Sequence, residues 1–485
     1  MIRGAWLALL LAACAPADPG DDDDATDVGV DDDDSGDDDD SGDDDDAVDD
    51  DDSDDRTVGL LFDDGGAWEG YTLLAPVQST TTWLIDLQGR IVHRWERDLT
   101  PGLVAYLLPD GQLLRTGNPG SGPQAPLQSG GAGGLVELLD WDGDLLFSHE
   151  VYGDDARLHH DVEVLPSGNV LLLAWERKTA QEAIAAGRDP TTLQDGELWS
   201  EMLLEVPTSG PAAGQVVWEW HLWDHLVQDL DPSLPGYGDP SALPQRVDVN
   251  FARNPRDDWQ HLNSVAYHAD RDEIVLSSHH NNELWIIDHV PSAAAMAGPD
   301  GDLLYRWGNP RAYGLGDEAD QTLFSQHDVH WIPDGHPGAG NLLIFNNGNN
   351  RPGGDASSIV EMAPPADYAR DPGQPWGGEL LWEWFDTPAE AFFAPQISGA
   401  QRLPNGNTLV CDGPHGTLFE LGPDGARTWI YLSPVGPQGP VAQGELPVNS
   451  QGNQSNPVFR ATRHAADGPE LVGRTLDPQG TIEGS

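Results

Sequence analysis

The chain has 485 residues, of which 83 are Asp or Glu and 23 are Lys or Arg, giving a formal net charge of −60 at pH 7. A negative field of this size excludes nucleic acid and anionic lipid headgroups as natural partners. Only Cys14 and Cys411 are present, so no intramolecular disulfide is expected once Cys14 is modified as argued below. We expect Cys411 to be a packed strand residue with no chemical role.

Residues 1–14 have the pattern of a bacterial lipoprotein signal. Arg3 supplies a positive charge, residues 5–11 are a short apolar stretch, and Leu11-Ala12-Ala13-Cys14 is a small-residue cleavage site that ends in a cysteine. The apolar stretch is too short to span a bilayer by itself. We therefore expect Cys14 to be lipidated and to anchor the protein to the cell envelope. Ala15 is compatible with the outer membrane, on its periplasmic or its exterior face.

Residues 15–56 form an Asp-rich segment. It carries 24 aspartates between Asp18 and Asp55, separated by Ser-Gly and Ala/Val spacers. Repulsion between like charges and the lack of apolar residues prevent a core from forming there. The segment is predicted to be a disordered tether between the lipid anchor and the domain that follows.

From residue 57 to residue 485 a strand motif repeats. It starts with a polar residue, continues with alternating apolar residues, turns at a sequence such as Pro-x-Gly-Asn and ends in a second apolar run. A second motif, apolar-Asp-x-x-Gly-x-apolar-x-Trp, alternates with the first and ends at residues such as Trp95 and Trp429. Two hairpins per repeat and six repeats predict an all-β fold, a six-bladed β-propeller. A β-sandwich or a pair of β-domains is the alternative, and repetition along the whole chain disfavours it. The six copies of the first motif begin at Leu103, His160, His261, His327, Ser398 and Arg460.

One interval, residues 176–259, lacks the turn signal. It contains a helix-like stretch at 179–186 and an aromatic-rich stretch at 218–225. We interpret it as an insertion in one blade that covers the mouth of the axial channel, because long ordered insertions are usually functional. A passive extra layer on that blade is an equally good interpretation.

Three histidines occupy the first position of the repeat. The innermost strand of each blade lines the channel, and equivalent positions converge there, so His160, His261 and His327 are predicted to meet. Ser398 and Arg460 stand at the same position in other copies and are predicted to line the substrate site.

Converging histidines have three chemical interpretations. They can bind a metal, with Asp161 and Asp328 orienting them, and act as a hydrolase or oxidase. They can form an acid–base set that includes a nucleophilic imidazole. A purely structural set is less favoured, and the spacing alone leaves the first two open.

The residues around these histidines resemble the bacterial arylsulfotransferase family. The resemblance runs from about Gly70 to Leu476. It implies a six-bladed propeller that moves a sulfuryl group from a phenolic sulfate ester to a phenol, with no nucleotide donor, metal or other cofactor. The implied mechanism is ping-pong transfer through a sulfohistidine. The similar strings are residues 259–265, 303–310, 326–331, 340–348 and 400–407.

The resemblance also implies roles for individual residues. His327, in Gln-His-Asp, corresponds to the nucleophile. His261 and Asn263 match a His-x-Asn pair that contacts the sulfuryl oxygens and the bridging oxygen. His160 matches a histidine of the same site, and its register favours it over His159 as the residue that points inward.

One departure from the family pattern affects the expected activity. Where the family has an arginine after the strand that ends in Ser277-Ser278, this chain has His279. A guanidinium is always charged, whereas an imidazole near pH 7 is mostly neutral. Either His279 acts as an imidazolium, or Arg460 replaces the arginine, or activity is altered or lost. The last case corresponds to a non-catalytic surface propeller that binds sulfated or phenolic ligands. The chain has no room for the dimerisation domain of some family members, so a monomer is expected.

Overall fold

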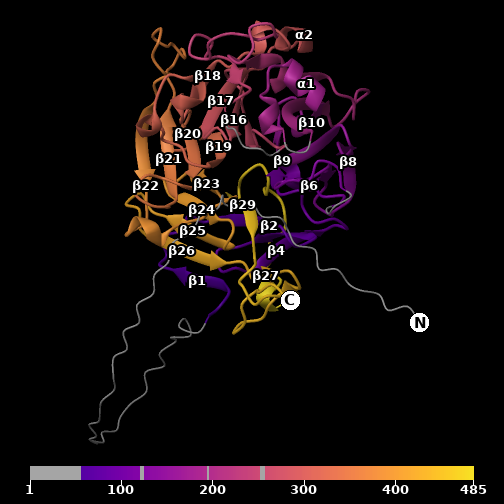
Figure 1. Ribbon diagram of the computed structural model, residues 1–485. Coiled ribbons are helices and arrows are strands. Elements are labelled where there is room, and N and C mark those ends of the chain that lie inside the picture. Colours follow the sequence, from indigo (N-terminus) through magenta and orange to yellow (C-terminus); the bar gives the residue numbers. More distant parts are fainter. Residues whose placement is uncertain (1–55, 121–124, 194–195, 252–256, 485) are drawn as a thin grey trace, which may run out of the picture.

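The structure, a computed structural model, describes residues 56–120, 125–193, 196–251 and 257–484. In this part of the chain, six antiparallel sheets of four or five strands are arranged around a common axis (Figure 1). The predicted six-bladed β-propeller is therefore confirmed. The predicted lipoprotein signal with Cys14 and the Asp-rich tether up to residue 55 lie outside the described residues.

Each blade is a meander whose first strand lies nearest the axis. The blades, from the inner strand outward, are β5 (Ala105–Leu108), β6 (Gln112–Gly117), β7 (Leu135–Leu139), β8 (Leu145–Glu150); β9 (Ala156–Val164), β10 (Asn169–Thr179), β11 (Glu197–Pro207), β12 (Trp218–His221); and β15 (Leu262–His268), β16 (Glu273–Ser278), β17 (Glu283–Asp288), β18 (Tyr305–Trp307). The other three are β19 (His327–Trp331), β20 (Leu342–Asn346), β21 (Ser358–Ala363), β22 (Glu379–Trp384); β23 (Gly399–Arg402), β24 (Thr408–Asp412), β25 (Thr417–Leu421), β26 (Arg427–Leu432), β1 (Gly59–Asp63); and β29 (Val458–His464), β2 (Tyr71–Pro76), β3 (Thr81–Ile85), β4 (Ile91–Glu96).

The two ends of the described chain close the ring. β29, near the C-terminal end, is the inner strand of the blade whose other strands are β2 to β4, and Figure 1 shows it in yellow beside the indigo β2. β1 adds a fifth strand outside β26 of the neighbouring blade. Each of these two blades therefore combines strands from the two ends of the described chain, and backbone hydrogen bonds within the blades join those ends.

Tryptophans on the fourth strands join neighbouring blades, which explains the second sequence repeat. Each indole is buried and its N–H donates to a carbonyl between the third and fourth strands of the next blade, so a large apolar side chain also satisfies its polar group. The four pairs are Trp95 with Asp140, Trp220 with Gly301, Trp384 with Gly425 and Trp429 with Leu87, at 2.8–3.1 Å.

The structure of the interval 176–259 corrects the prediction that these residues form an insertion. Its β11 and β12 are the third and fourth strands of a regular blade, so the interval is not a single insertion. Apart from the turn between β11 and β12, two described segments lie outside the blade: residues 180–193 with 196, and residues 222–251 with 257–261. The first segment contains helix α1 (Ala180–Ala185), which begins with a capping box of Thr179 and Glu182 and confirms the helical stretch. The missing turn motif did not indicate an insertion here. The strands β10 and β11 are simply longer than the other strands of the blades, with 11 residues each.

The second segment packs between two blades. Val247 and Trp259 are completely buried beside Leu276 and Trp285 of the following blade. Short strands β13 (Leu226–Val227) and β14 (Val247–Asp248) pair within it. Its expected role as a cover of the channel mouth stays a prediction.

Three smaller features complete the fold. Helix α2 (Ala293–Met296) and the hairpin of β27 (Val435–Gly436) and β28 (Gly439–Pro440) lie in loops. Cys411 is a buried residue of β24, as expected from the sequence. No helix in the ranges described is long and apolar enough to cross a membrane.

Candidate functional site: a cluster of channel histidines

The histidines predicted to converge lie together, His160 within β9, His261 just before β15 and His327 at the start of β19. The ring centroids of His160 and His261 are 4.5 Å apart, those of His261 and His279 are 5.3 Å apart, and those of His279 and His327 are 5.2 Å apart. Phe459, on β29, contacts the rings of His160 and His327 from the side. The structure thus brings together all four histidines that the sequence selected, with His279 between His261 and His327.

A shared backbone conformation produces this convergence. The first position of the repeat has a left-handed φ at Leu103 (106°), His160 (51°), His261 (54°) and Ser398 (86°), and in the blade of His327 the next residue, Asp328, has it (53°). Each such residue costs on the order of 1–2 kcal/mol because its Cβ crowds the following carbonyl. Shifts in the pairing register lie at or next to the three histidine positions. Together, these local distortions redirect the side chains at the strand starts.

The hydrogen bonds of Asn347 determine which nitrogen of His327 carries a proton. Asn347 Nδ2 donates to the carbonyls of Ala394 at 2.7 Å and Ile397 at 3.0 Å, so its Oδ1 must face His327. His327 Nδ1 lies 2.8 Å from that oxygen and 3.2 Å from the carbonyl of Ser325. Both partners can only accept, so Nδ1 carries the hydrogen. In the neutral ring, Nε2 therefore keeps its lone pair.

The surroundings of His327 and His160 keep these two imidazoles neutral. Burial lowers the pKa of His327 to about 3, against the opposing effect of its hydrogen bond to Asn347. Burial, together with the charges of His261 and the other nearby histidines, places the pKa of His160 well below its usual range. A neutral imidazole with an available lone pair is a nucleophile, so His327 is suited to attack an electrophilic centre.

His261 is held by a carboxylate that the sequence did not identify. Its Nδ1 is 2.6 Å from Asp258 Oδ2. Burial acts to raise the pKa of Asp258, but the charge and hydrogen bond of His261 lower it below its ordinary value. The ionised carboxylate accepts from Nδ1 and stabilises the imidazolium form of His261. An imidazolium beside His327 supplies positive charge where a reacting group gains negative charge.

Asn263 positions the residue before His327. Its Nδ2 donates to the carbonyl of Gln326 at 2.8 Å. Gln326 in turn donates from Nε2 to the carbonyls of Ser278 and Glu283, which connects the strand that precedes His279 to the start of β19. The expected contact of Asn263 with sulfuryl oxygens stays a prediction.

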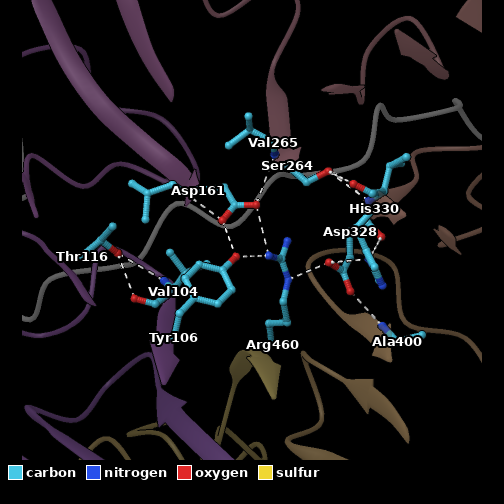
Figure 2. Close-up of polar contacts among 12 residues, drawn as sticks. Val104, Tyr106, Thr116, Asp161, Ser264, Val265, Asp328, His330, Ala400 and Arg460 are labelled. Atoms are coloured by element: carbon cyan, nitrogen blue, oxygen red, sulfur yellow. Dashed lines mark hydrogen bonds and ion pairs between the residues drawn. The ribbon is translucent and has the colours of Figure 1, made fainter. Parts of the chain in front are cut away.

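Arg460 lies at the centre of an ion-pair network that joins inner strands (Figure 2). Its Nε is 2.8 Å from Asp328 Oδ1, and its Nη1 is 3.1 Å from Asp161 Oδ2 and also donates to the Tyr106 hydroxyl. Two carboxylates thus compensate its charge. Arg460 therefore joins inner strands, an arrangement that does not favour it as the replacement for the family arginine.

The aspartates that follow His160 and His327 also connect blades. The inner strands of adjacent blades do not form a continuous ladder, so side chains satisfy their backbone N–H groups. Asp161 and Asp328 were interpreted as orienters of metal-binding histidines, and the structure assigns them this bridging role instead. The four bridges, each from a backbone N–H to a side-chain oxygen, are Val265 to Asp161, Val329 to Ser264, Ala400 to Asp328 and Arg463 to Gln401, at 2.7–3.2 Å.

The structure does not bring Ser398 into the histidine cluster. Its side chain is completely buried, donates to the carbonyl of Gln396 at 3.2 Å and accepts from the N–H of Gly413 at 3.0 Å. These bonds hold the loop before β23. The expected role of Ser398 in binding substrate stays a prediction, and the bonds described here give it a structural one.

Beyond Arg460 the channel widens into a cavity of about 430 Å³ with walls from all six inner strands. None of the four clustered histidines lines it. Burial raises the pKa of Glu163, on its wall, to about 8. Within the ranges that the structure describes, no three His, Cys, Asp or Glu side chains are arranged to hold a metal ion.

Comparisons with known proteins identify the family of this chain. Arylsulfate sulfotransferase AssT of Escherichia coli O6:H1 (strain CFT073) is 26% identical over 324 residues, which are 59% of this chain and 50% of that protein. The matched segment thus spans about half the length of this relative. A crystal structure of a protein of unknown function from Bacteroides caccae has a TM-score of 0.44 at 10% identity and covers 82% of this chain and 99% of its own. A streptogramin B lyase has a TM-score of 0.38 at 9% identity, with 84% and 93% covered. The family model described as arylsulfotransferase (ASST) matches residues 77–432, most of the described propeller, and the chain belongs to this family.

Proposed function

We propose that this protein transfers a sulfuryl group from an aryl sulfate to a phenol through a covalent sulfohistidine at His327. The observation that carries the proposal is the state of His327. Its Nδ1–H is held by Asn347, its pKa is lowered to about 3, and its Nε2 has a lone pair. Membership of the arylsulfotransferase family supports the choice of the sulfuryl group as the group transferred.

In the first half-reaction, Nε2 of His327 attacks sulfur. The N–S bond forms as the S–O bond breaks, and the electron pair leaves with the phenolate oxygen. In the second half-reaction, the oxygen of an acceptor phenol attacks the same sulfur, and the N–S electron pair returns to Nε2. His261, backed by Asp258, supplies positive charge to the sulfuryl oxygens in both steps.

His279 lies where the family arginine is expected, between the rings of His261 and His327. We infer that its contribution to charge stabilisation depends on its protonation. An imidazole contributes one donor, whereas a guanidinium contributes a planar fork. We therefore place His279 on the sulfuryl oxygens and Arg460 among the residues that hold the strands.

Intact-protein mass spectrometry tests the proposal directly. After brief incubation with a chromogenic aryl sulfate, the protein is expected to gain the mass of one sulfuryl group and to lose it when a phenol is added. Saturable binding of the aryl sulfate with no adduct and no phenol release would instead identify a non-catalytic binding propeller.

Replacing Asn347 by Leu is expected to lower kcat/KM by about 10- to 100-fold, because His327 loses the acceptor that sets its tautomer and ring orientation. Initial rates of phenol release measure the effect. Asn349→Leu is the matched control, since Asn349 lies two residues further on and its Nδ2 donates only to the carbonyl of Pro395. Equal rates in the two variants would contradict the role given to Asn347.

We also propose that the protein is held at the envelope, in the outer membrane, by a lipid on Cys14. The support is the sequence Leu11-Ala12-Ala13-Cys14. In a bacterial host, Cys14→Ala is expected to move the protein from the membrane fraction to the soluble fraction and to abolish labelling by a fatty acid. Cys411→Ala should leave both unchanged. A membrane-bound, labelled Cys14→Ala protein would refute the anchor.

A further inference from the structure

A buried hydrogen-bonded pair lies behind His160. His159 Nδ1 is 2.9 Å from His160 Nδ1, and His159 Nε2 is 2.9 Å from Glu201 Oε2. Both His159 and Glu201 are 0% exposed. A continuous chain of hydrogen bonds therefore runs from β11 to the inner strand β9 and ends at the histidine cluster.

Packing fixes each member of this chain. The ring of His159 stacks on Trp175, with centroids 4.1 Å apart. Glu201 Oε1 accepts from the N–H of Leu262 at 2.9 Å, next to His261. The ring of His160 fills the space where a side chain on Gly131 would lie, since a Cβ there would be 2.1 Å from His160 Cε1. The distances thus reflect a tightly packed arrangement and not a surface contact.

Two proton arrangements satisfy these bonds. A bond between two Nδ1 atoms needs one hydrogen, carried by one ring or the other. In the stored state, His159 is protonated on both nitrogens and faces the Glu201 carboxylate, and neutral His160 carries its hydrogen on Nε2. In the released state, His159 keeps only its Nε2–H. His160 then carries its hydrogen on Nδ1 and has a lone pair on Nε2.

We propose that Glu201 and His159 form a proton relay that lets His160 donate a proton to the departing phenolate and recover one from the acceptor phenol. The inference rests on the proposed function. As the S–O bond breaks, the Nε2 proton of His160 goes to the phenolate oxygen, and the Nδ1 proton of His159 passes to His160. When the acceptor attacks, its O–H proton goes to His160 Nε2 and the Nδ1 proton returns to His159. The two half-reactions together restore the stored state.

The electrostatics of the cluster agree with such a relay. Burial and the neighbouring histidines His261, His159, His327 and His279 lower the pKa of His160 well below its usual range, so an imidazolium at His160 is unfavourable. The relay never requires an imidazolium at His160, because His160 is neutral in both the stored and the released state. Burial raises the pKa of Glu201, although the charge and hydrogen bond of His159 oppose it. The raised pKa of Glu201 and the lowered pKa of His160 both favour keeping the extra proton at the Glu201 end of the hydrogen-bonded chain.

The test uses a series of aryl sulfates whose leaving phenols range from acidic, as in 4-nitrophenyl sulfate, to weakly acidic, as in 4-methoxyphenyl sulfate. In Glu201→Gln, the rate of phenol release is expected to fall about 100-fold for the weakly acidic phenols. It should change little for 4-nitrophenyl sulfate, whose phenolate leaves without a proton. The slope of rate against leaving-group acidity thus becomes steeper. An equal loss along the whole series, or no loss, would overturn the relay.

Two further variants separate chemistry from folding. His159→Phe keeps an aromatic ring on Trp175 and removes both nitrogens, so the same steeper slope is expected. Glu205→Gln is the matched control: Glu205 is on the same strand and pairs with His289 Nε2 at 3.3 Å, away from the cluster, and its slope should equal that of the unaltered protein. If the unaltered protein releases no phenol from any donor, the proposed function itself fails, and the relay with it. A relay that fails alone leaves phenol release with an unchanged slope in Glu201→Gln.

Discussion

His327→Ala is expected to lose on the order of 10⁴-fold or more in turnover of any aryl sulfate, because removal of a covalent nucleophile eliminates both half-reactions. The sulfuryl adduct seen by mass spectrometry should disappear with it. Truncation removes a buried ring that contacts Phe459 and His279, so thermal unfolding must be measured on the same sample. His327→Gln keeps more of the volume and should be equally inactive.

A histidine elsewhere in the same blade provides the control. His336, in the turn after β19, is half-buried, and its Nδ1 lies 3.3 Å from the carbonyl of Asp334. His336→Ala is expected to keep both the adduct and the turnover. A His327→Ala protein that turns over normally would remove His327 from the mechanism. An adduct that remains in that variant would place the sulfuryl group on another side chain, and His261 and His160 would be the next to replace.

The propeller could be predicted from the sequence because its repeats are local in sequence and equivalent in space. Position within a repeat determines whether a side chain faces the axis, so three histidines at one register position were sufficient to predict their convergence. The tryptophans of the second motif could be recognised in the sequence for the same reason, since each makes the same contact with the next blade. A contact that recurs in every blade produces a repeat in the sequence.

Contacts that do not follow the repeat were missed. Asp258 lies in the segment before β15, and Glu201 lies on an outer strand within the interval taken as an insertion. Neither stands at a repeat position, and an acidic chain offers many carboxylates as alternatives. Asn347 lies in a string similar to the family, but its role depends on the carbonyls of Ala394 and Ile397, some 50 residues away. Tertiary contacts of this kind have no local sequence signal.

Arg460 shows how the same register position can have a different role in another blade. The position was predicted to line the substrate site, and its side chain does bridge the inner strands of other blades. However, the aspartates that follow His160 and His327 converge there as well, and a buried cation between two carboxylates forms ion pairs. The identity of the neighbouring residues, rather than the register alone, decides whether such a group can act on a ligand.

Arg460→Met is accordingly expected to destabilise the fold by about 3–5 kcal/mol, because it leaves two carboxylates buried without their cation. The side chains of Asp161 and Asp328 are 0% and 4% exposed. Denaturant unfolding measures the loss. Arg94→Met is the matched control, since Arg94 and Glu96 are 51% and 64% exposed and the change should stay within about 0.5 kcal/mol. Comparable losses in the two variants would contradict the importance of the network around Arg460.

The pH dependence of this loss has a definite sign. Burial acts to raise the pKa of Asp328, but the charge of Arg460 lowers it below its ordinary value. In the unaltered protein this group therefore adds stability above the pKa of an unfolded Asp, and the contribution is lost as pH falls through the folded pKa. Without Arg460, burial raises the pKa of Asp328, and protonation relieves the penalty. The difference in unfolding free energy between Arg460→Met and the unaltered protein should thus shrink from pH 7 toward pH 4.

A triple variant separates charge from packing. Adding Asp161→Asn and Asp328→Asn to Arg460→Met should recover much of the stability at pH 7, because the buried charges are then gone. A triple variant as unstable as Arg460→Met would show that packing, rather than charge, holds the inner strands together.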